Sequence, residues 1–228
     1  MAEQMNAAVY HGKRVDDGRG VNKEQLLEAL WPGLVPDNGA NHDEFNRPGG
    51  GRLMMALLHS GAIDNFGHWH IDALQVQLDL AVDDSAHHLC VTPMELGSGT
   101  QARCYNRKAP DVKSSRFGLQ RLGVDFSKYP NFSEIARADL HARDIYYSRD
   151  AAGSLKTVIV CSAEEAKTAD DGPQYRLVPH CQHHFVSEKL NALVSVGYCR
   201  VYLKDWRDIE AAWRSLLESF VVADRQTS

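Results

Sequence analysis

The feature that most constrains the fold is the C-terminal stretch from Tyr175 to Val221, which predicts two β-strands leading into one amphipathic helix. The stretch from Leu190 to Leu203 is rich in Val, Leu and Tyr, which is typical of a strand buried on both faces. After Asp205, which is placed to cap the helix, apolar residues recur at spacings of mostly three and four. These are Trp206, Ile209, Trp213, Leu216, Leu217 and Phe220. A central strand therefore leads into a helix that covers a sheet.

The opposite face of this helix is polar and is expected to face solvent. It carries Arg207, Glu210, Arg214 and Glu218. Such a division into an apolar and a charged face is the usual pattern of a helix lying on a core.

Other strands are predicted from alternation in the middle of the chain. From Ile71 to Val82, apolar residues alternate with mostly polar ones, which is the period of a half-buried antiparallel strand. A return strand is predicted at His87 to Thr92 and a third at Arg103 to Asn106. Gly153 permits a turn between Asp144–Ser148 and Leu155–Cys161, which predicts a hairpin.

Helices are predicted mainly near the N-terminus. One runs from Asn22 to Leu30 and ends before Pro32, and an apolar helix follows at Leu53 to Ala62. Ser133 is placed to cap another over Glu134 to Leu140. Because helices and strands are segregated along the chain, we expect the α+β class. The prediction is an antiparallel sheet of about six to eight strands, covered by the C-terminal amphipathic helix and by N-terminal helices.

Length and composition indicate one globular domain over residues 1–228. If the chain instead forms two domains, the boundary is expected near residues 107–140. With 228 residues and 43% hydrophobic residues, the chain can bury a core of its own. We expect no nucleic-acid partner, because the net charge is −5 and the sequence has no run of basic residues. No segment has the roughly 20 apolar residues that cross a bilayer. Without a signal sequence, the expected compartment is the cytoplasm, or the periplasm if a signal has been removed.

Two long polar stretches, Val35 to Gly51 and Arg107 to Tyr129, are predicted to be loops. Long ordered loops often carry function, whereas disordered ones serve as linkers. Gly49 to Gly51, followed by Arg52, is similar to a phosphate-binding loop, but the Lys-Ser/Thr ending is missing. A hinge is the simpler interpretation of the glycines.

The cysteines leave two alternatives open. They are Cys90, Cys104, Cys161, Cys181 and Cys199, an odd number without a CxxC spacing. Cys90, Cys161 and Cys199 lie in or beside Val-containing runs, where a thiol acts as a small buried apolar group. The alternative is a disulfide, for instance between Cys181 and Cys199 across adjacent strands.

Chemistry is suggested mainly by two histidine clusters. His68 and His70 precede the predicted strand at residue 71, and residues two apart on a strand point the same way. Both imidazoles would then reach one metal ion.

The second cluster lies between His180 and His184. In a strand these two residues share one face, with Cys181 and His183 on the other. A zinc site built from His68, His70 and one of these would suit a hydrolase, with Asp72 either hydrogen-bonded to a ligating imidazole or acting as general base. The alternative is that the histidines make structural or interfacial hydrogen bonds, since no HExxH or CxxC spacing is present.

Two further classes of hydrolase have less support in the sequence. Cys104 or Cys181 next to a histidine would suit a cysteine hydrolase, but many chains of this size offer such pairs. A GxSxG serine-hydrolase motif is absent from the sequence.

The last fifth of the chain resembles the C-terminal part of bacterial proteins found beside type VI secretion toxins. The residues that carry the resemblance are Cys181, His184, Phe185, Leu190, Asn191, Trp206 and Ile209. The strand-then-helix ending is also similar to the PsbP-like fold, a non-catalytic binding scaffold. The resemblance implies an immunity protein without cofactor that binds and neutralises a cognate secreted toxin through the loops Val35 to Gly51 and Arg107 to Tyr129. The alternative is the zinc hydrolase, and a toxin with a Cys/His site is a third.

Overall fold

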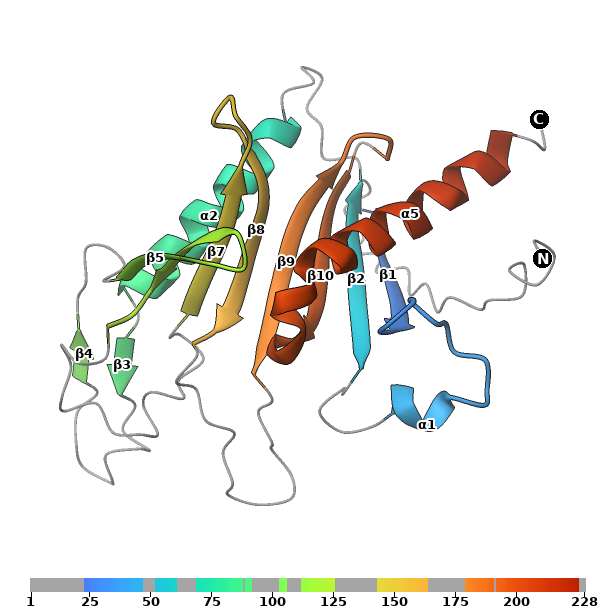
Figure 1. The fold of residues 1–228 in the computed structure, drawn as a ribbon, viewed down its shortest axis with the longest axis horizontal. Coiled ribbons are helices and arrows are strands. Elements are labelled where there is room, and N and C mark those ends of the chain that lie inside the picture. The colour runs from blue at the N-terminus through green and yellow to red at the C-terminus, as the bar shows by residue number, and fades with distance from the viewer. Residues whose placement is uncertain are drawn as a thin grey trace. The chain divides into compact units, whose positions relative to one another are not determined.

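The computed structural model describes nine stretches of the chain (Figure 1). These are residues 23–46, 52–60, 69–87, 89–91, 103–105, 112–125, 143–163, 179–190 and 192–225. An eight-stranded antiparallel sheet has the order β1-β2-β10-β9-β8-β7-β6-β5. Its strands are β1 (Lys23–Leu30), β2 (Leu53–Ser60), β5 (Val112–Arg116), β6 (Leu119–Gly123), β7 (Arg143–Arg149), β8 (Leu155–Ser162), β9 (His180–Ser187) and β10 (Ala192–Cys199). This arrangement confirms the predicted antiparallel sheet within an α+β chain.

Within the described ranges, the other elements are a two-stranded sheet of β3 (Leu89–Val91) and β4 (Arg103–Tyr105) and four helical segments. The helical segments are α1 (His42–Phe45), α2 (Trp69–His87), η3 (Arg200–Asp205) and α5 (Trp206–Arg225). The chain divides into two compact units, residues 1–72 with 182–228 and residues 73–181. The single domain expected from the sequence stays a prediction.

In the first unit, α5 follows β10 as the sequence predicted. Trp206, Ile209, Trp213 and Leu217 are buried at helical spacing. Phe220 was expected on the same face but is 43% exposed, because it lies near the end of the helix. The chain enters α5 through the 3-10 helix η3, so the strand expected up to Leu203 ends earlier, at Cys199.

The helices predicted at Asn22–Leu30 and Leu53–Ala62 are wrong. Both regions are strands, β1 and β2, which pair with Leu27 opposite Ala56 and Ala29 opposite Met54. These four residues are buried, and β2 also pairs with β10. Residues such as Leu, Glu and Ala favour helix locally, but pairing with neighbouring strands, β2 for β1 and both β1 and β10 for β2, overrides that preference. Neither predicted N-terminal helix is present in the described part of residues 1–68. The helix found there is the four-residue α1, which lies in the stretch Val35 to Gly51 that was predicted to be a loop.

In the second unit, β7 and β8 form the predicted hairpin around Gly153, which has a φ of +87°. The strand predicted at Ile71–Val82 is wrong, because this region is α2. Leu74 and Leu78, four residues apart, are buried, whereas Val76 and Leu80 are 50% and 59% exposed. Of the alternating apolar residues from Leu74 to Val82, only Leu74 and Leu78 are buried, and a spacing of four is that of a helix face. Ala73, next to Leu74, is buried as well.

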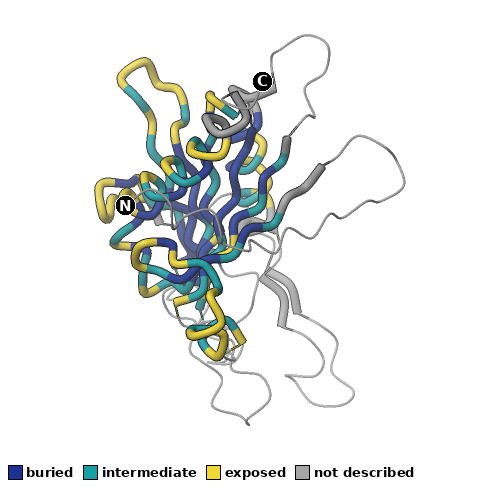
Figure 2. Tube along the Cα trace, turned by 90° about the vertical axis from the view of Figure 1, so that its right-hand side faces the viewer, coloured by how far each residue is buried: buried dark blue, intermediate teal, exposed yellow. Residues whose placement is uncertain are grey.

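β3 and β4 lie within the two short strands predicted after residue 87 and pair with each other. The loop predicted from Arg107 to Tyr129 instead contains the β5–β6 hairpin. The helix predicted at Glu134–Leu140 lies outside the described residues. Buried residues concentrate in the strands and exposed residues in the turns (Figure 2).

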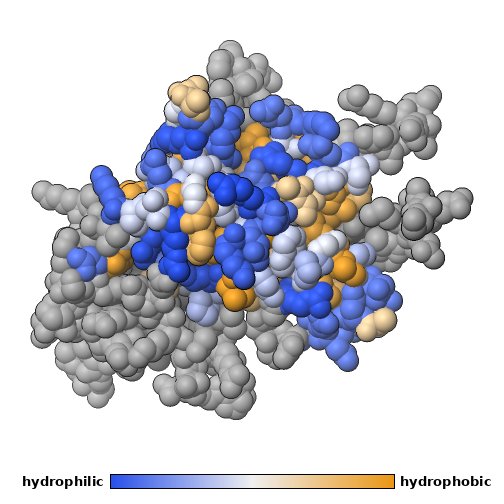
Figure 3. All heavy atoms as spheres, viewed as in Figure 1, coloured by the Kyte–Doolittle hydropathy of each residue, from blue (hydrophilic) through white to orange (hydrophobic). Residues whose placement is uncertain are grey.

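None of the helices in the described ranges is long and apolar enough to span a membrane. Of the described residues on the face shown in Figure 3, most are hydrophilic, with hydrophobic residues scattered among them. Among the residues whose burial is described, the exposed large apolar side chains are Val35, Met55, Val76, Leu80, Phe117, Val201 and Phe220.

Candidate functional site

The first candidate is the segment of residues 35–46, which we call the polar loop. It begins where Leu30 and Val35 exchange two backbone hydrogen bonds, of 2.9 and 3.0 Å between N and O. Between them Leu34 has a φ of 49°, a left-handed value that is rare for a residue with a side chain. Its side chain is buried, and this burial offsets the backbone strain. The start of the polar loop is therefore fixed to the end of β1.

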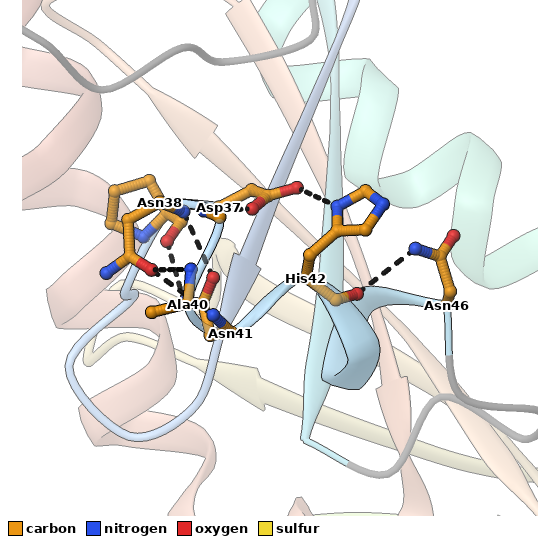
Figure 4. Close-up of polar contacts among 8 residues, drawn as sticks. Asp37, Asn38, Ala40, Asn41, His42 and Asn46 are labelled. Atoms are coloured by element: carbon orange, nitrogen blue, oxygen red, sulfur yellow. Dashed lines mark hydrogen bonds and ion pairs between the residues drawn. The ribbon is translucent and has the colours of Figure 1, made fainter.

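Side chains within the polar loop hold its shape (Figure 4). Asp37 Oδ1 accepts a hydrogen bond from the Gly39 amide at 2.9 Å, and Asn38 Oδ1 accepts one from the Ala40 amide at 3.1 Å. Asn41 Oδ1 accepts from the Asn38 amide at 3.0 Å, and Asn41 Nδ2 donates to the Pro36 carbonyl at 2.9 Å. These are the local bonds by which Asn and Asp stabilise turns. The polar loop is thus an ordered segment.

The polar loop also carries charge at its surface. His42 Nδ1 lies 2.7 Å from Asp37 Oδ2, and hydrogen bonding to this carboxylate raises the pKa of His42. The His42 side chain is 61% exposed. Arg52, the residue before β2, contacts this segment and the end of β1: its Nη1 lies 3.3 Å from Glu44 Oε2, and its Nε donates to the Trp31 carbonyl. This arrangement offers carboxylates, amides and one imidazole to a partner.

The second candidate is the β5–β6 hairpin of residues 112–123, which we call the basic hairpin. Its two turn residues, Phe117 and Gly118, have φ values of 55° and 75°, as a type I′ turn requires. The segment contains Lys113, Arg116 and Arg121 and no acidic residue. The Arg116 guanidinium lies over the Phe117 ring, 4.9 Å from its centroid. The hairpin is therefore a compact, positively charged projection.

The base of the basic hairpin is anchored in the second unit. Arg121 donates to Asp144 Oδ1 from Nε at 3.1 Å and from Nη2 at 2.8 Å, and Asp144 is buried. Leu119 is buried as well. Gly123 allows this approach, because a Cβ there would lie 2.7 Å from Asp144 Oδ1. The anchor leaves the outer strand, β5, as the exposed part.

The reasoning that brought His68 and His70 together is wrong, because residue 70 lies in a helix. Residues two apart on a helix do not share a face. His68 and the side chain of His70 lie outside the described residues. In the described ranges, no group of three or more His, Cys, Asp or Glu side chains is placed to hold a metal ion. The zinc site therefore stays a prediction.

The alternation predicted for the second cluster matches the structure. On β9, His180 is exposed and His184 is partly buried, while Cys181 and His183 are fully buried. His184 Nδ1 lies 2.8 Å from Ser195 Oγ. Burial, together with the neighbouring imidazoles of His183 and His59, lowers the pKa of His184 to about 4. His184 is thus neutral at pH 7.

The cysteine pairing differs from the one considered. Cys181 forms a disulfide with Cys161 on β8 and not with Cys199. This corrects the interpretation of Cys161 as a structural thiol and removes Cys181 as a thiolate nucleophile. Cys199 remains a thiol, and burial raises its pKa.

The sequence analysis missed a buried polar network between β9 and α5. His183 Nε2 lies 3.1 Å from Glu210 Oε2, and Tyr198 Oη lies 3.4 Å from His183 Nδ1. Arg214 donates to Glu210 Oε1 from Nε at 2.9 Å and from Nη2 at 2.7 Å, and to the Val186 carbonyl at 2.7 Å. Glu210 and Arg214 were assigned to the solvent face. Only their i,i+4 spacing hinted at the pair.

Burial acts to raise the pKa of Glu210, but hydrogen bonds and charge from His183 and Arg214 outweigh it and lower this pKa. The ring of His183 also makes edge contacts with Phe185, Tyr198 and Trp206. These hydrogen bonds join side chains of α5 to β9, so the network stabilises the packing of α5 on the sheet. It agrees with the structural alternative considered for the histidines.

No family model matches the sequence, and no curated protein matches it. Among solved structures, the fold is similar to that of Smlt3025, an immunity protein of the Stenotrophomonas maltophilia type IV secretion system. The likeness has a TM-score of 0.53 and covers 88% of this chain and 82% of that one, at 19% sequence identity. At this identity, the comparison establishes a shared fold.

Proposed function

We propose that this protein is a non-enzymatic immunity protein that binds a cognate secreted toxin and neutralises it. The observation that carries the proposal is the fold likeness to a secretion-system immunity protein over 88% of the chain. It agrees with the resemblance of the last fifth of the sequence to immunity proteins, which rests on different information. Fold alone does not define function, so the surface must also suit a partner.

The polar loop and the basic hairpin supply such surfaces. Each is exposed over most of its length, yet each is held by contacts of its own: the Asp37–His42 pair in the loop and the Arg121–Asp144 pair in the hairpin. A segment that is ordered before binding loses less conformational entropy when a partner binds. Both lie within the two stretches that the sequence suggested for partner binding.

The secretion system and the compartment belong to the proposal as well. The sequence resemblance points to type VI toxins, whereas the structural neighbour belongs to a type IV system. The toxin of either system would satisfy the proposed role. The Cys161–Cys181 disulfide favours an oxidising compartment such as the periplasm, because disulfides seldom persist in the cytoplasm.

The proposal is tested by whether this protein protects a host from the toxin and by the stoichiometry of their complex. Candidate toxins, taken from the genes that neighbour the gene of this protein, are expressed in the cytoplasm and in the periplasm of a host, with and without this chain. We expect growth to be restored in one compartment and a one-to-one complex by light scattering. A chain that neither restores growth nor co-purifies with the toxin contradicts the proposal. A chain that acts at substoichiometric amounts would indicate an enzyme.

A further inference from the structure

The strand β5 lies at one edge of the eight-stranded sheet. Among the described strands it pairs with β6 alone, and its side chains from Lys113 to Arg116 are all exposed. The edge strand β1 differs, because Leu30 exchanges two hydrogen bonds with Val35 and the side chains of Leu27 and Ala29 are buried. An exposed edge strand offers backbone donors and acceptors to a further strand.

The register shows which backbone groups face the open edge. The two-residue turn makes Arg116 and Leu119 a hydrogen-bonded pair, and such pairs alternate along an antiparallel ladder. Ser114 therefore bonds inward to Arg121, whereas Ser115 and Lys113, opposite Gln120 and Leu122, occupy non-hydrogen-bonded positions. The amide and carbonyl groups of Lys113 and Ser115 thus point away from β6.

The charged side chains of β5 determine which kind of strand would pair favourably with it. Lys113 and Arg116 are an odd number of residues apart, so their side chains lie on opposite faces of the hairpin. A strand added along β5 would meet one cation on each face. Acidic residues are favoured opposite them, and like charges directly opposite are unfavourable. A second copy of β5 would bring the same two cations together, which disfavours self-pairing.

We propose that an extended, acidic segment of the protein partner adds to β5 as a further strand. The backbone of Lys113 and Ser115 would form the ladder, while Lys113 and Arg116 face carboxylates of the added segment. This inference rests on the proposed function, in which that partner is the toxin. It belongs to the known modes of peptide recognition, where main-chain hydrogen bonds give affinity and side chains give specificity.

Hydrogen exchange at single residues tests the ladder directly. When the toxin binds, we expect the amides of Lys113 and Ser115 to gain protection. The amides of Ser114 and Arg116 already bond to β6 and should change little. Uniform protection of all four amides would indicate side-chain docking without strand addition. No change at any of them would overturn the inference.

Two variants test the affinity. Ser115→Pro removes an outward amide at an edge, where proline is tolerated, and we expect toxin binding to weaken about tenfold. The double change Lys113→Glu with Arg116→Glu should weaken it by at least about tenfold at low salt and by less at high salt. Lys204→Glu, a matched change at an exposed cation of η3, is the control and should bind like wild type. If the double variant binds within about twofold of this control, the inference is wrong.

A peptide separates this inference from the proposed function. If the wild-type chain does not bind the toxin at all, the proposed function fails. A synthetic peptide of alternating glutamate and valine is then titrated into the isotope-labelled protein. We expect amide shifts to be largest at Lys113 and Ser115, and absent with a peptide of alternating lysine and valine. Equal responses to both peptides, or none, would refute strand addition.

Discussion

Replacing Glu210 by Ala tests how the buried network holds α5 on the sheet. Glu210 accepts hydrogen bonds from His183 Nε2 at 3.1 Å and from Arg214 Nη2 at 2.7 Å. His183 is 0% exposed, so losing its carboxylate partner costs about 1–3 kcal/mol, as for a buried polar group that loses its partner. The Arg214 side chain is 32% exposed and keeps the Val186 carbonyl, so its share is about 0.5–1 kcal/mol.

The free energy of unfolding should therefore fall by about 1.5–4 kcal/mol. The assay is urea denaturation at pH 7, read as a shift of the midpoint at constant slope. Glu218→Ala is the matched control on the same helix, since its partner Lys189 is 66% exposed, and it should cost less than about 1 kcal/mol. The reasoning is refuted if Glu210→Ala costs no more than Glu218→Ala.

Three further predictions concern other parts of the fold. The folded pKa of His184 is about 4 against 6.5 for the ordinary group, so its neutral form stabilises the fold above pH 6.5. That stability, about 3 kcal/mol, is lost as the pH falls toward 4, and His184→Gln should flatten this part of a stability-against-pH profile. Gly123→Ala places a Cβ against Asp144 and should lower stability by about 1–3 kcal/mol in urea denaturation. Trp213→Ala empties a fully buried site and should cost about 3–5 kcal/mol by the same assay.

Control substitutions test the physical reasons given for the Gly123 and Trp213 predictions, and the acid profile tests the one for His184. Gly197→Ala adds a methyl group whose nearest neighbour is an ordinary 3.5 Å contact, so it should cost less than Gly123→Ala. Phe220→Ala removes a half-exposed aromatic from the same helix as Trp213 and should cost much less. An acid profile of His184→Gln that parallels wild type between pH 6.5 and 4 would contradict the assignment of acid sensitivity to His184.

The candidate site was predictable in its location and not in its form. Polar composition identified Val35–Gly51 and Arg107–Tyr129, but a loop of Asx turns and a β-hairpin look alike in composition. The turn at Phe117-Gly118 lacks the Asn-Gly or Asp-Gly pair that marks most such hairpins. The prediction of a zinc site depended on reading residues 68–70 as the start of a strand, and α2 removes that argument.

The elements whose burial follows local periodicity could be predicted from the sequence alone. These are α5, the alternation of His180 to Ser187 along β9, the buried strand β10 and the hairpin of β7 and β8. In each, the spacing of apolar residues matches the geometry of the element that buries them, so no distant contact is needed to choose it.

Tertiary structure decided the remainder, because distant partners outweigh local preference. β1 and β2 are strands since each pairs with a neighbour, against the helix preference of their residues. The partner of Cys181 was set by the neighbouring position of Cys161 on β8, and Glu210 became part of a buried network because β9 places His183 beneath α5. Such pairings join residues far apart in sequence, and a local pattern carries no information about which strand or helix will lie alongside.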